Sequence, residues 1–252
     1  MNYPILVILG LAPSIIWLLF YLRHDQHPEP NRVVIKIFVF GMLVAPLALA
    51  LQIGLLALVN HPENIKDLIA RPQSLTAFIL NIAVFAPIVE EFLKYKMVQT
   101  KALADPEFDE PLDAMLYCII AALGFAAVEN LIIVFQLDIK EAVLQMSARF
   151  LSATFLHALA SGIVGFWLAV SILRQRKKFW LVGIGLALAI FCHSLYNYLI
   201  WRWDATKQTW PFLFLVAALL IFMAVLVVYQ FKKLKKLSST CNVTNQDTNF
   251  SH

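Results

Sequence analysis

Long apolar runs, separated by short polar connections, dominate this sequence. A membrane-spanning helix needs about 20 mainly apolar residues. With 61% hydrophobic and 14% charged residues, the chain also has too little polar surface for a soluble globule of its length. We therefore expect an all-α, polytopic transmembrane bundle of about seven helices. The candidate spans lie near residues 4–22, 33–59, 75–99, 113–136, 149–173, 179–201 and 211–231.

Basic residues in the short loops predict the orientation of this bundle, because Lys and Arg favour the cytoplasmic side. Basic clusters follow the fifth run, at 174–178, and the seventh run, at 232–236. Two runs separate these clusters, so both can be cytoplasmic. The pattern predicts an N-out, C-in chain whose sparsely basic loops, near 60–74, 137–148 and 202–210, lie outside.

The apolar runs are close enough in sequence to pack as one unit. We interpret residues 1–237 as a single transmembrane domain with its polar motifs at 75–200, and residues 238–252 as a polar, disordered cytoplasmic tail. The basic residues stand beside apolar runs, as expected of topology signals and contacts with the lipid bilayer, so we exclude nucleic acid as a partner. The three cysteines form neither a disulfide framework nor a CxxC metal site.

Ionisable residues interrupt the third to sixth runs, whereas the first, second and seventh runs lack interior charges. Each such residue costs about 2.5–3.5 kcal/mol on insertion scales, so a chain that carries several has a use for them. This segregation predicts a functional site inside the middle helices. The residues, with two accompanying amides, are Glu90, Glu91, Lys94, Glu129, Asn130, His157, His193 and Asn197.

Glu90 and Glu91 are adjacent, so on a helix their side chains point about 100° apart and have different roles. Lys94 lies within helical reach of either carboxylate. We expect Lys94 to neutralise one glutamate and leave the other to act as a base or ligand. The alternative is a structural Glu–Lys pair whose lysine extends to the helix end. Pro87, just before the pair, is expected to bend this helix towards a polar cavity.

Glu129 and Asn130 follow the small-residue stretch 121–127, which permits close approach of helices. Alone, Glu129 is equally well explained as a protonated carboxyl group hydrogen-bonded across helices. A lone histidine is more often a satisfied core residue than a ligand. His157 and His193 in neighbouring runs, together with the carboxylates, shift the balance towards an assembled site in the outer half of the bilayer.

At these positions the sequence resembles the PrsW family of intramembrane proteases, which is related to CAAX-processing and Abi-type membrane peptidases. Four motifs in the same order carry the resemblance: Pro87-x-x-Glu90-Glu91-x-x-Lys94, Gly124-Phe-Ala-Ala-Val-Glu129-Asn130, His157-Ala-Leu-Ala-x-Gly162 and His193-x-x-x-Asn197. The resemblance implies a peptidase of the bacterial cytoplasmic membrane that cleaves a membrane-anchored protein substrate, such as an anti-sigma factor, from the extracytoplasmic side. By position, it implies that Glu90, Glu91, Glu129, His157 and His193 are essential.

The residues themselves suggest a hydrolytic mechanism. A water deprotonated by Glu90 or Glu91 would attack the scissile carbonyl, and a metal or the pair His193 and Asn197 would stabilise the oxyanion. Lys94 and Asn130 would support the site. The sequence does not decide between a metal and a metal-free glutamate mechanism. Zn²⁺ is the candidate ion, and its ligands would be Glu129, His157 and His193.

Three alternatives stay open. Glu and His chains also form relays in proton-coupled transporters, although the two halves of this chain show no repeat. A rhomboid-like serine peptidase would use Ser161, but position 159 is Leu where that pattern has Gly, so Ser161 fits small-residue helix packing better. A catalytically silent protein that retains substrates in the membrane is the third alternative.

Overall fold

The computed structural model describes residues 2–23, 28–60, 83–174, 178–206 and 210–248, and the regular structure of these residues is helical throughout. Within them, six helical segments are long and apolar enough to cross a membrane. The prediction of an all-α, polytopic bundle is therefore confirmed. The helices are α1 (Tyr3–Leu22), α2 (Asn31–Asn60), α5 (Ala86–Met97), α6 (Pro111–Val134), α7 (Ile139–Leu151), α8 (Ala153–Leu173), α9 (Lys178–Ala205) and α10 (Trp210–Thr248), and a π-helical segment, η2 (Val98–Ala102), continues α5.

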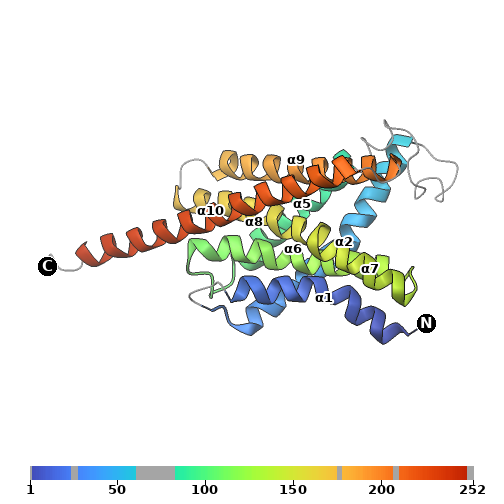
Figure 1. Cartoon of the computed structure of the whole chain (residues 1–252). Coiled ribbons are helices and arrows are strands. Elements are labelled where there is room, and N and C mark those ends of the chain that lie inside the picture. The colour runs from blue at the N-terminus through green and yellow to red at the C-terminus, as the bar shows by residue number, and fades with distance from the viewer. Residues whose placement is uncertain (1, 24–27, 61–82, 175–177, 207–209, 249–252) are drawn as a thin grey trace.

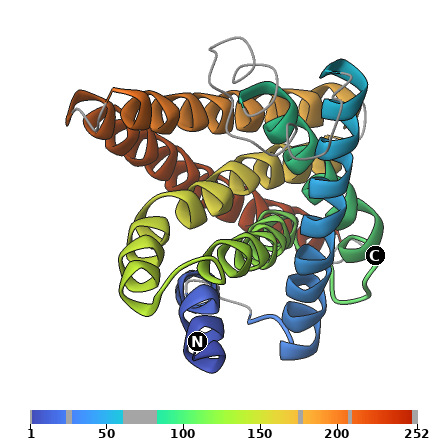
Figure 2. The same ribbon diagram turned by 90° about the vertical axis from the view of Figure 1, so that its right-hand side faces the viewer.

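Helices α6 and α8 form the core of the bundle. They pack against each other, and most of their residues are buried. Figure 2 shows them passing through the middle of the molecule, with α1, α2, α9 and α10 around them. Large apolar side chains on the outer helices are exposed, among them Ile8, Leu43, Phe191 and Phe222. An apolar exterior of this kind is suited to contact with lipid.

The close contact of α2 with α6 depends on two glycines. A Cβ atom on Gly41 of α2 would collide with the backbone carbonyl oxygen of Ala121, and one on Gly124 of α6 would collide with that of Phe38. The two backbones therefore touch directly, as expected from the small residues at 121–127. Pro46 lies inside α2, beyond this contact.

Helix α6 begins where the sequence changes from polar to apolar. Its first residue is Pro111, and Asp113 accepts hydrogen bonds from the backbone N–H groups of Glu110, at 2.7 Å, and Asp109, at 3.2 Å. Proline at the first position and a capping box are both typical of helix N-termini. This start places Glu129 and Asn130 in the last two turns of the helix.

The third predicted span, 75–99, lies partly outside the described residues. Its described part is α5, which carries Pro87 in its first turn directly after a π-helical segment at 83–85. Helical geometry therefore changes just before Glu90 and Glu91. About two turns separate Pro87 from Lys94, the lysine of the motif.

The connection predicted as a loop at 137–148 is mostly helical, because residues Ile139–Leu151 form α7, whereas its location outside stays a prediction. Asp138 caps this helix by accepting a hydrogen bond from the backbone N–H of Glu141 at 2.9 Å. Ala142 and Met146, four residues apart, are buried against Leu6 of α1. The short helix is thus amphipathic, and the next span starts at α8 rather than at residue 149.

The C-terminal segment also differs from the prediction. Helical backbone of α10 continues to Thr248, into the stretch expected to be a disordered tail, and Figure 1 shows it extending beyond the bundle. The single domain at residues 1–237 and the N-out, C-in orientation stay predictions.

Candidate active site

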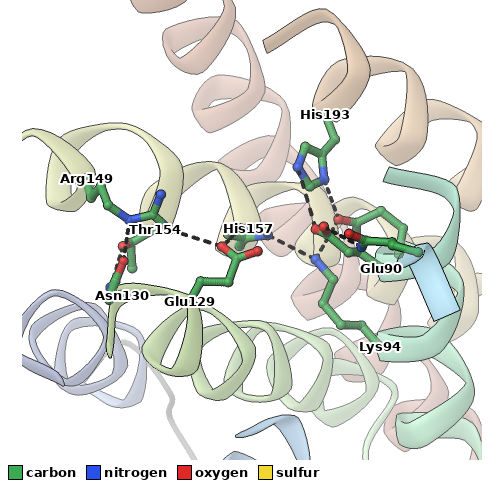
Figure 3. A network of polar contacts seen from close by, with 10 residues as sticks. Glu90, Lys94, Glu129, Asn130, Arg149, Thr154, His157 and His193 are labelled. Carbon is green, nitrogen blue, oxygen red and sulfur yellow. Dashed lines mark hydrogen bonds and ion pairs between the residues drawn. The ribbon is translucent and has the colours of Figure 1, made fainter. Parts of the chain in front are cut away.

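The ionisable residues of the middle helices meet in one polar network. Figure 3 shows it running from Arg149 and Asn130, through Glu129 and His157, to Lys94, Glu90 and His193. Helix α5 supplies both adjacent glutamates and the lysine, α6 supplies Glu129 and Asn130, and α8 and α9 supply one histidine each. Arg149 comes from α7, so five helices between residues 86 and 205 contribute to the network.

Lys94 lies at the centre of the network and is 2% exposed. Its Nζ donates a hydrogen bond to Glu91 Oε1 at 2.6 Å and lies 3.0 Å from His157 Nδ1. Lys94 therefore neutralises Glu91 rather than Glu90, and it does not extend to the helix end. A lysine ammonium only donates, so His157 Nδ1 accepts and its Nε2 carries the proton.

The Nε2 atom of His157 faces Glu129. It donates to Glu129 Oε2 at 2.9 Å, and Arg149 Nη2 donates to the same oxygen at 3.0 Å. Arg149 Nε also donates to Asn130 Oδ1, and Asn130 Nδ2 donates to Thr154 Oγ1 at 3.2 Å. The side chain of Glu129 is 27% exposed, so this part of the network reaches the surface.

Sequence reasoning missed Arg149 and Thr154. Arg149 lies at the edge of the fifth apolar run, where a basic residue resembles a topology signal. Its position near the C-terminal end of the unforeseen helix α7 brings it to Glu129.

His193 lies beside both adjacent glutamates. Its Nδ1 is 2.9 Å from Glu91 Oε1, and its Nε2 is 3.8 Å from Glu90 Oε2. Glu90 Oε1 accepts a hydrogen bond from Gln52 of α2 at 3.0 Å. Glu90 Oε2 is buried and has no hydrogen-bond partner among the described residues. Because buried polar atoms are normally satisfied, an orphaned carboxylate oxygen indicates a place for a water, an ion or a substrate.

Gln52 is the other residue missed from the sequence. It carries no charge, so it did not stand out in the second run, although a single amide among apolar residues of a span is itself a signal. Asn197 lies one turn after His193 on α9 and is half-buried, and its predicted role stays a prediction. Ser161 Oγ donates to Glu91 Oε2 at 3.5 Å, so its hydroxyl faces a carboxylate rather than a histidine, unlike a serine nucleophile.

The residues present fit a metal ion. One ligand atom from each of Glu90, Glu91, His157 and His193 lies within 4.8 Å of the others, and all four residues are buried. Imidazole and carboxylate are the ligands that zinc sites use, and the orphaned Glu90 oxygen needs a partner. Glu129 stands outside this group, behind His157, in the position of a carboxylate that orients a metal-binding histidine.

A cavity of about 250 Å³ leads to the network from the outer surface of the bundle. Leu49 and Ile132 on its wall are both more than 40% exposed, so the cavity opens sideways, between α2 and α6. It reaches Glu90 and Glu129, whereas Glu91 is not part of its lining. The lining residues are Ala45, Leu49, Gln52, Glu90, Phe125, Glu129, Ile132, Ile133 and Arg149.

Comparison with known proteins identifies the family. Residues 29–229 match the PrsW family of intramembrane metalloproteases. This chain belongs to that family. It is therefore an intramembrane protease, a hydrolase with several membrane spans, and the comparisons give no support to the transporter alternative. The PrsW resemblance carried by the four motifs is confirmed.

Several curated relatives are named Protease PrsW, and this chain matches them over most of their length. Protease PrsW of Geobacillus kaustophilus is 29% identical over 208 residues, which cover 82% of this chain and 83% of the relative. Protease PrsW of Halalkalibacterium halodurans is 28% identical over 77% of this chain and 83% of the relative. Protease PrsW of Bacillus subtilis is 26% identical over 91% of this chain and 94% of the relative. No solved structure matches the chain significantly.

Proposed function

We propose that this protease hydrolyses a peptide bond of a membrane-anchored protein near the extracytoplasmic side of a bacterial cytoplasmic membrane, and that the substrate class is anti-sigma factors. One observation carries the proposal: a sideways-opening cavity reaches Glu90 from the outer surface of the bundle, and the buried Oε2 atom of this residue has no hydrogen-bond partner among the described residues. A substrate anchored in the bilayer would approach from this direction. Family membership and the bacterial relatives also support it.

In this proposal Glu90 is the general base. A water between Glu90 Oε2 and His193 Nε2, atoms 3.8 Å apart, would be close to both. Glu90 takes a proton from this water as its oxygen attacks the scissile carbonyl carbon in the cavity. The C–N bond then breaks, and the protonated Glu90 returns its proton to the leaving amine. Asn197, one turn after His193 on α9, would donate a hydrogen bond to the oxyanion.

The other residues hold this arrangement in place. Glu91, neutralised by Lys94, orients His193 through its Nδ1. Glu129, fixed by Arg149, orients His157 through its Nε2. Gln52 orients Glu90 and stands in the cavity wall, where its amide can also meet the backbone of an extended peptide.

Zn²⁺ is the metal we propose for this family member, with Glu91, His157 and His193 as the residues that would hold it and Glu90 beside them as the base. When bound, such an ion lowers the pKa of a bound water and polarises a carbonyl. Glu129, which the sequence suggested as a metal ligand, instead accepts a hydrogen bond from His157 Nε2 and so orients this histidine. Lys94 contacts Glu91 and His157, so its ammonium competes with a cation for these two ligands.

The test is cleavage in cells of tagged single-span membrane proteins, anti-sigma factors among them. We compare the intact protein with Glu90→Gln and His193→Ala at matched expression, and with Glu141→Gln, an exposed glutamate on α7, as the control. Loss of cleavage in the first two variants alone supports the proposal. Full cleavage by Glu90→Gln would overturn the assignment of the base.

The metal is tested separately on purified protein. Elemental analysis by mass spectrometry should find zinc in the intact protein and less zinc in His193→Ala than in Glu141→Gln. Chelation should abolish cleavage, and added Zn²⁺ should restore it. Full activity of metal-free protein would contradict the zinc proposal and leave the glutamate mechanism in place.

A further inference from the structure

The cavity that reaches Glu90 has a polar part and an apolar part. Its polar lining residues belong to the catalytic network or bond to it directly: Gln52, Glu90, Glu129 and Arg149. The rest of the lining is apolar and consists of Ala45, Leu49, Phe125, Ile132 and Ile133. Hydrolysis itself requires none of these five side chains. The apolar part is called the side-chain pocket below.

Helical periodicity places apolar and polar lining residues side by side. On α2, Ala45 and Leu49 are four residues apart and lie on one face, and Gln52 continues that face about one turn later. On α6, Phe125 lies four residues before Glu129 on the same face. A substrate whose peptide bond meets the polar residues therefore has a side chain beside the apolar ones.

The ring of Phe125 forms the inner wall of the side-chain pocket. Phe125 is 2% exposed, and its ring centroid lies 5.6 Å from that of His157 and 4.8 Å from Lys94 Nζ. Because it lines the cavity and also contacts these two residues, the ring separates the cavity from the enclosed charges of the network. A side chain in the pocket thus meets a hydrocarbon surface on this side instead of an ammonium group.

Charges at the edge of the side-chain pocket discriminate against charged substrate residues. Glu90, in the ionised form that a base requires, adds its charge to that of Glu129, and Arg149 is already bonded to Glu129 and Asn130. The carboxylates would repel an acidic side chain, which would also lose its hydration in the apolar part. A basic side chain would pair with Glu90 and occupy the oxygen that takes a proton from water. An uncharged, apolar side chain avoids both penalties.

We propose that the side-chain pocket selects an uncharged aliphatic residue of the substrate next to the scissile bond, and that Ala45 and Leu49 determine the size it accepts. This inference rests on the proposed function, because the scissile carbonyl must lie in the same cavity. Ala45 is 4% exposed and packs with Phe125 at the inner end, whereas Leu49 is 44% exposed at the open end. A larger residue at position 45 makes the pocket shallower, and a smaller one at position 49 widens its mouth.

Competition between substrates tests the inference in the full-length protein. The cleavage site of one tagged single-span membrane protein is first determined by mass spectrometry of its fragments. The residues on the two sides of the scissile bond are then replaced, one side at a time, by alanine, leucine, phenylalanine, aspartate or lysine. The five substrates of each series compete for the protein in vesicles, which yields ratios of kcat/KM that do not depend on the amount of active protein.

For one side of the scissile bond, we expect leucine to be cleaved about 10-fold or more faster than aspartate or lysine. Ala45→Val should lower the ratio of leucine to alanine cleavage, and Leu49→Ala should raise the ratio of phenylalanine to leucine cleavage. Each ratio should change by about 10-fold or more, as expected for methylene groups in an apolar pocket. Leu49 is exposed, so its truncation tests the pocket even if Ala45→Val fails to fold.

Leu47→Ala is the matched control. Leu47 lies two residues before Leu49 on α2 and is similarly exposed, at 51%, but it does not line the cavity. This variant should keep the ratios of the intact protein. The same change of ratio in Leu47→Ala as in Leu49→Ala would overturn the inference, because the cavity would then not be the cause.

The remaining outcomes separate this inference from the proposed function. Equal cleavage of the leucine, aspartate and lysine substrates by the intact protein, on both sides of the bond, would overturn the inference and leave the proposed function in place. Cleavage of no tagged single-span membrane protein would contradict the proposed function and, with it, the inference.

Discussion

The polar network has two halves that meet at His157 and differ in their surroundings. On the Nδ1 side of His157, the side chains of Glu91 and Lys94 are 0% and 2% exposed. On the Nε2 side, those of Glu129 and Arg149 are 27% and 14% exposed. The first half is enclosed by α5, α8 and α9, whereas the second half contributes to the cavity between α2 and α6.

This difference shows how a membrane bundle can keep charges in its interior. A buried charge is tolerated only when it is paired, and removal of one partner leaves the other uncompensated. In the enclosed half, Lys94 is therefore as important for the fold as for the chemistry. In the open half, partial exposure to solvent lowers the free-energy penalty of an unpaired charge. Substitutions of Glu129 and Arg149 should therefore destabilise the fold less.

The largest effect should come from removing the base. We expect Glu90→Gln to lower kcat/KM by about 10²–10⁴-fold, the range of general acid–base catalysis. Glu129→Gln should lower it by about 10–100-fold, the range for residues that orient a ligand or base. The measurement is cleavage of one tagged single-span substrate in vesicles. A larger loss for Glu129→Gln than for Glu90→Gln would reverse the roles of the two halves.

Lys94→Met should be the most destabilising single change in the enclosed half. Breaking a buried ion pair by removing one partner costs about 3–5 kcal/mol. The control is Lys96→Met, on the exposed side of the same helix, which should change stability by less than about 0.5 kcal/mol. Thermal unfolding of the detergent-solubilised protein measures both.

The double variant Lys94→Met/Glu91→Gln sharpens this result. It removes both charges of the pair, so it should recover much of the stability that Lys94→Met loses. Its catalytic activity should stay low, because His193 loses its carboxylate partner. If the double variant is no more stable than Lys94→Met, the broken Glu91–Lys94 pair does not explain the stability lost in Lys94→Met.

A smaller effect is expected in the open half. Arg149→Gln loses bonds to Glu129 and Asn130, and a hydrogen bond to a charged group contributes about 1.5–3 kcal/mol. The melting temperature should therefore fall less than in Lys94→Met, and KM should rise because Arg149 also lines the cavity. Lys140→Gln, an exposed cation on the same helix, is the matched control. A fall as large as that of Lys94→Met would remove the distinction between the halves.

The smallest effect is expected at an ion pair outside the network. Lys36 donates to Asp105 at 2.8 Å, and its side chain is 42% exposed, so Asp105→Asn should cost less than about 1 kcal/mol. The hydrogen bond from Lys36 holds the pKa of Asp105 below its usual range. A lowered carboxyl pKa stabilises the fold above the unfolded-state pKa, and this stability is lost as the pH falls through the folded-state pKa. Melting curves of the two proteins should thus differ slightly at neutral pH and coincide in acid.

Much of this arrangement could be predicted from the sequence, because burial of charge in apolar runs is unusual enough to mark a site. The adjacent glutamates, the lysine and the two histidines were found in this way, and the structure brings them together. The choice of partner for Lys94 could not be predicted, since helical spacing allows both carboxylates. Glu91 is chosen because it faces the histidines of α8 and α9, and only the packing of those helices determines that.

The residues that were missed share a different reason. Gln52 is uncharged, and Arg149 stands at the edge of an apolar run, so neither violates the expected polarity of its segment. Both reach the site through tertiary structure: Gln52 across the α2–α5 contact, and Arg149 because residues 139–151 form a helix instead of a loop. A polarity pattern identifies charged residues inside apolar segments, and it overlooks site residues whose polarity is ordinary for their segment.

The backbone contact between α2 and α6 has a consequence for how a substrate gains access. Gly41 and Gly124 fix α2 on α6 before Pro46, whereas Leu49 and Gln52, which line the cavity, come after it. The first half of α2 cannot part from α6 without breaking this contact. The part of α2 that could move to widen the cavity for a peptide is therefore the half that follows Pro46, where proline leaves the helix without one backbone hydrogen bond.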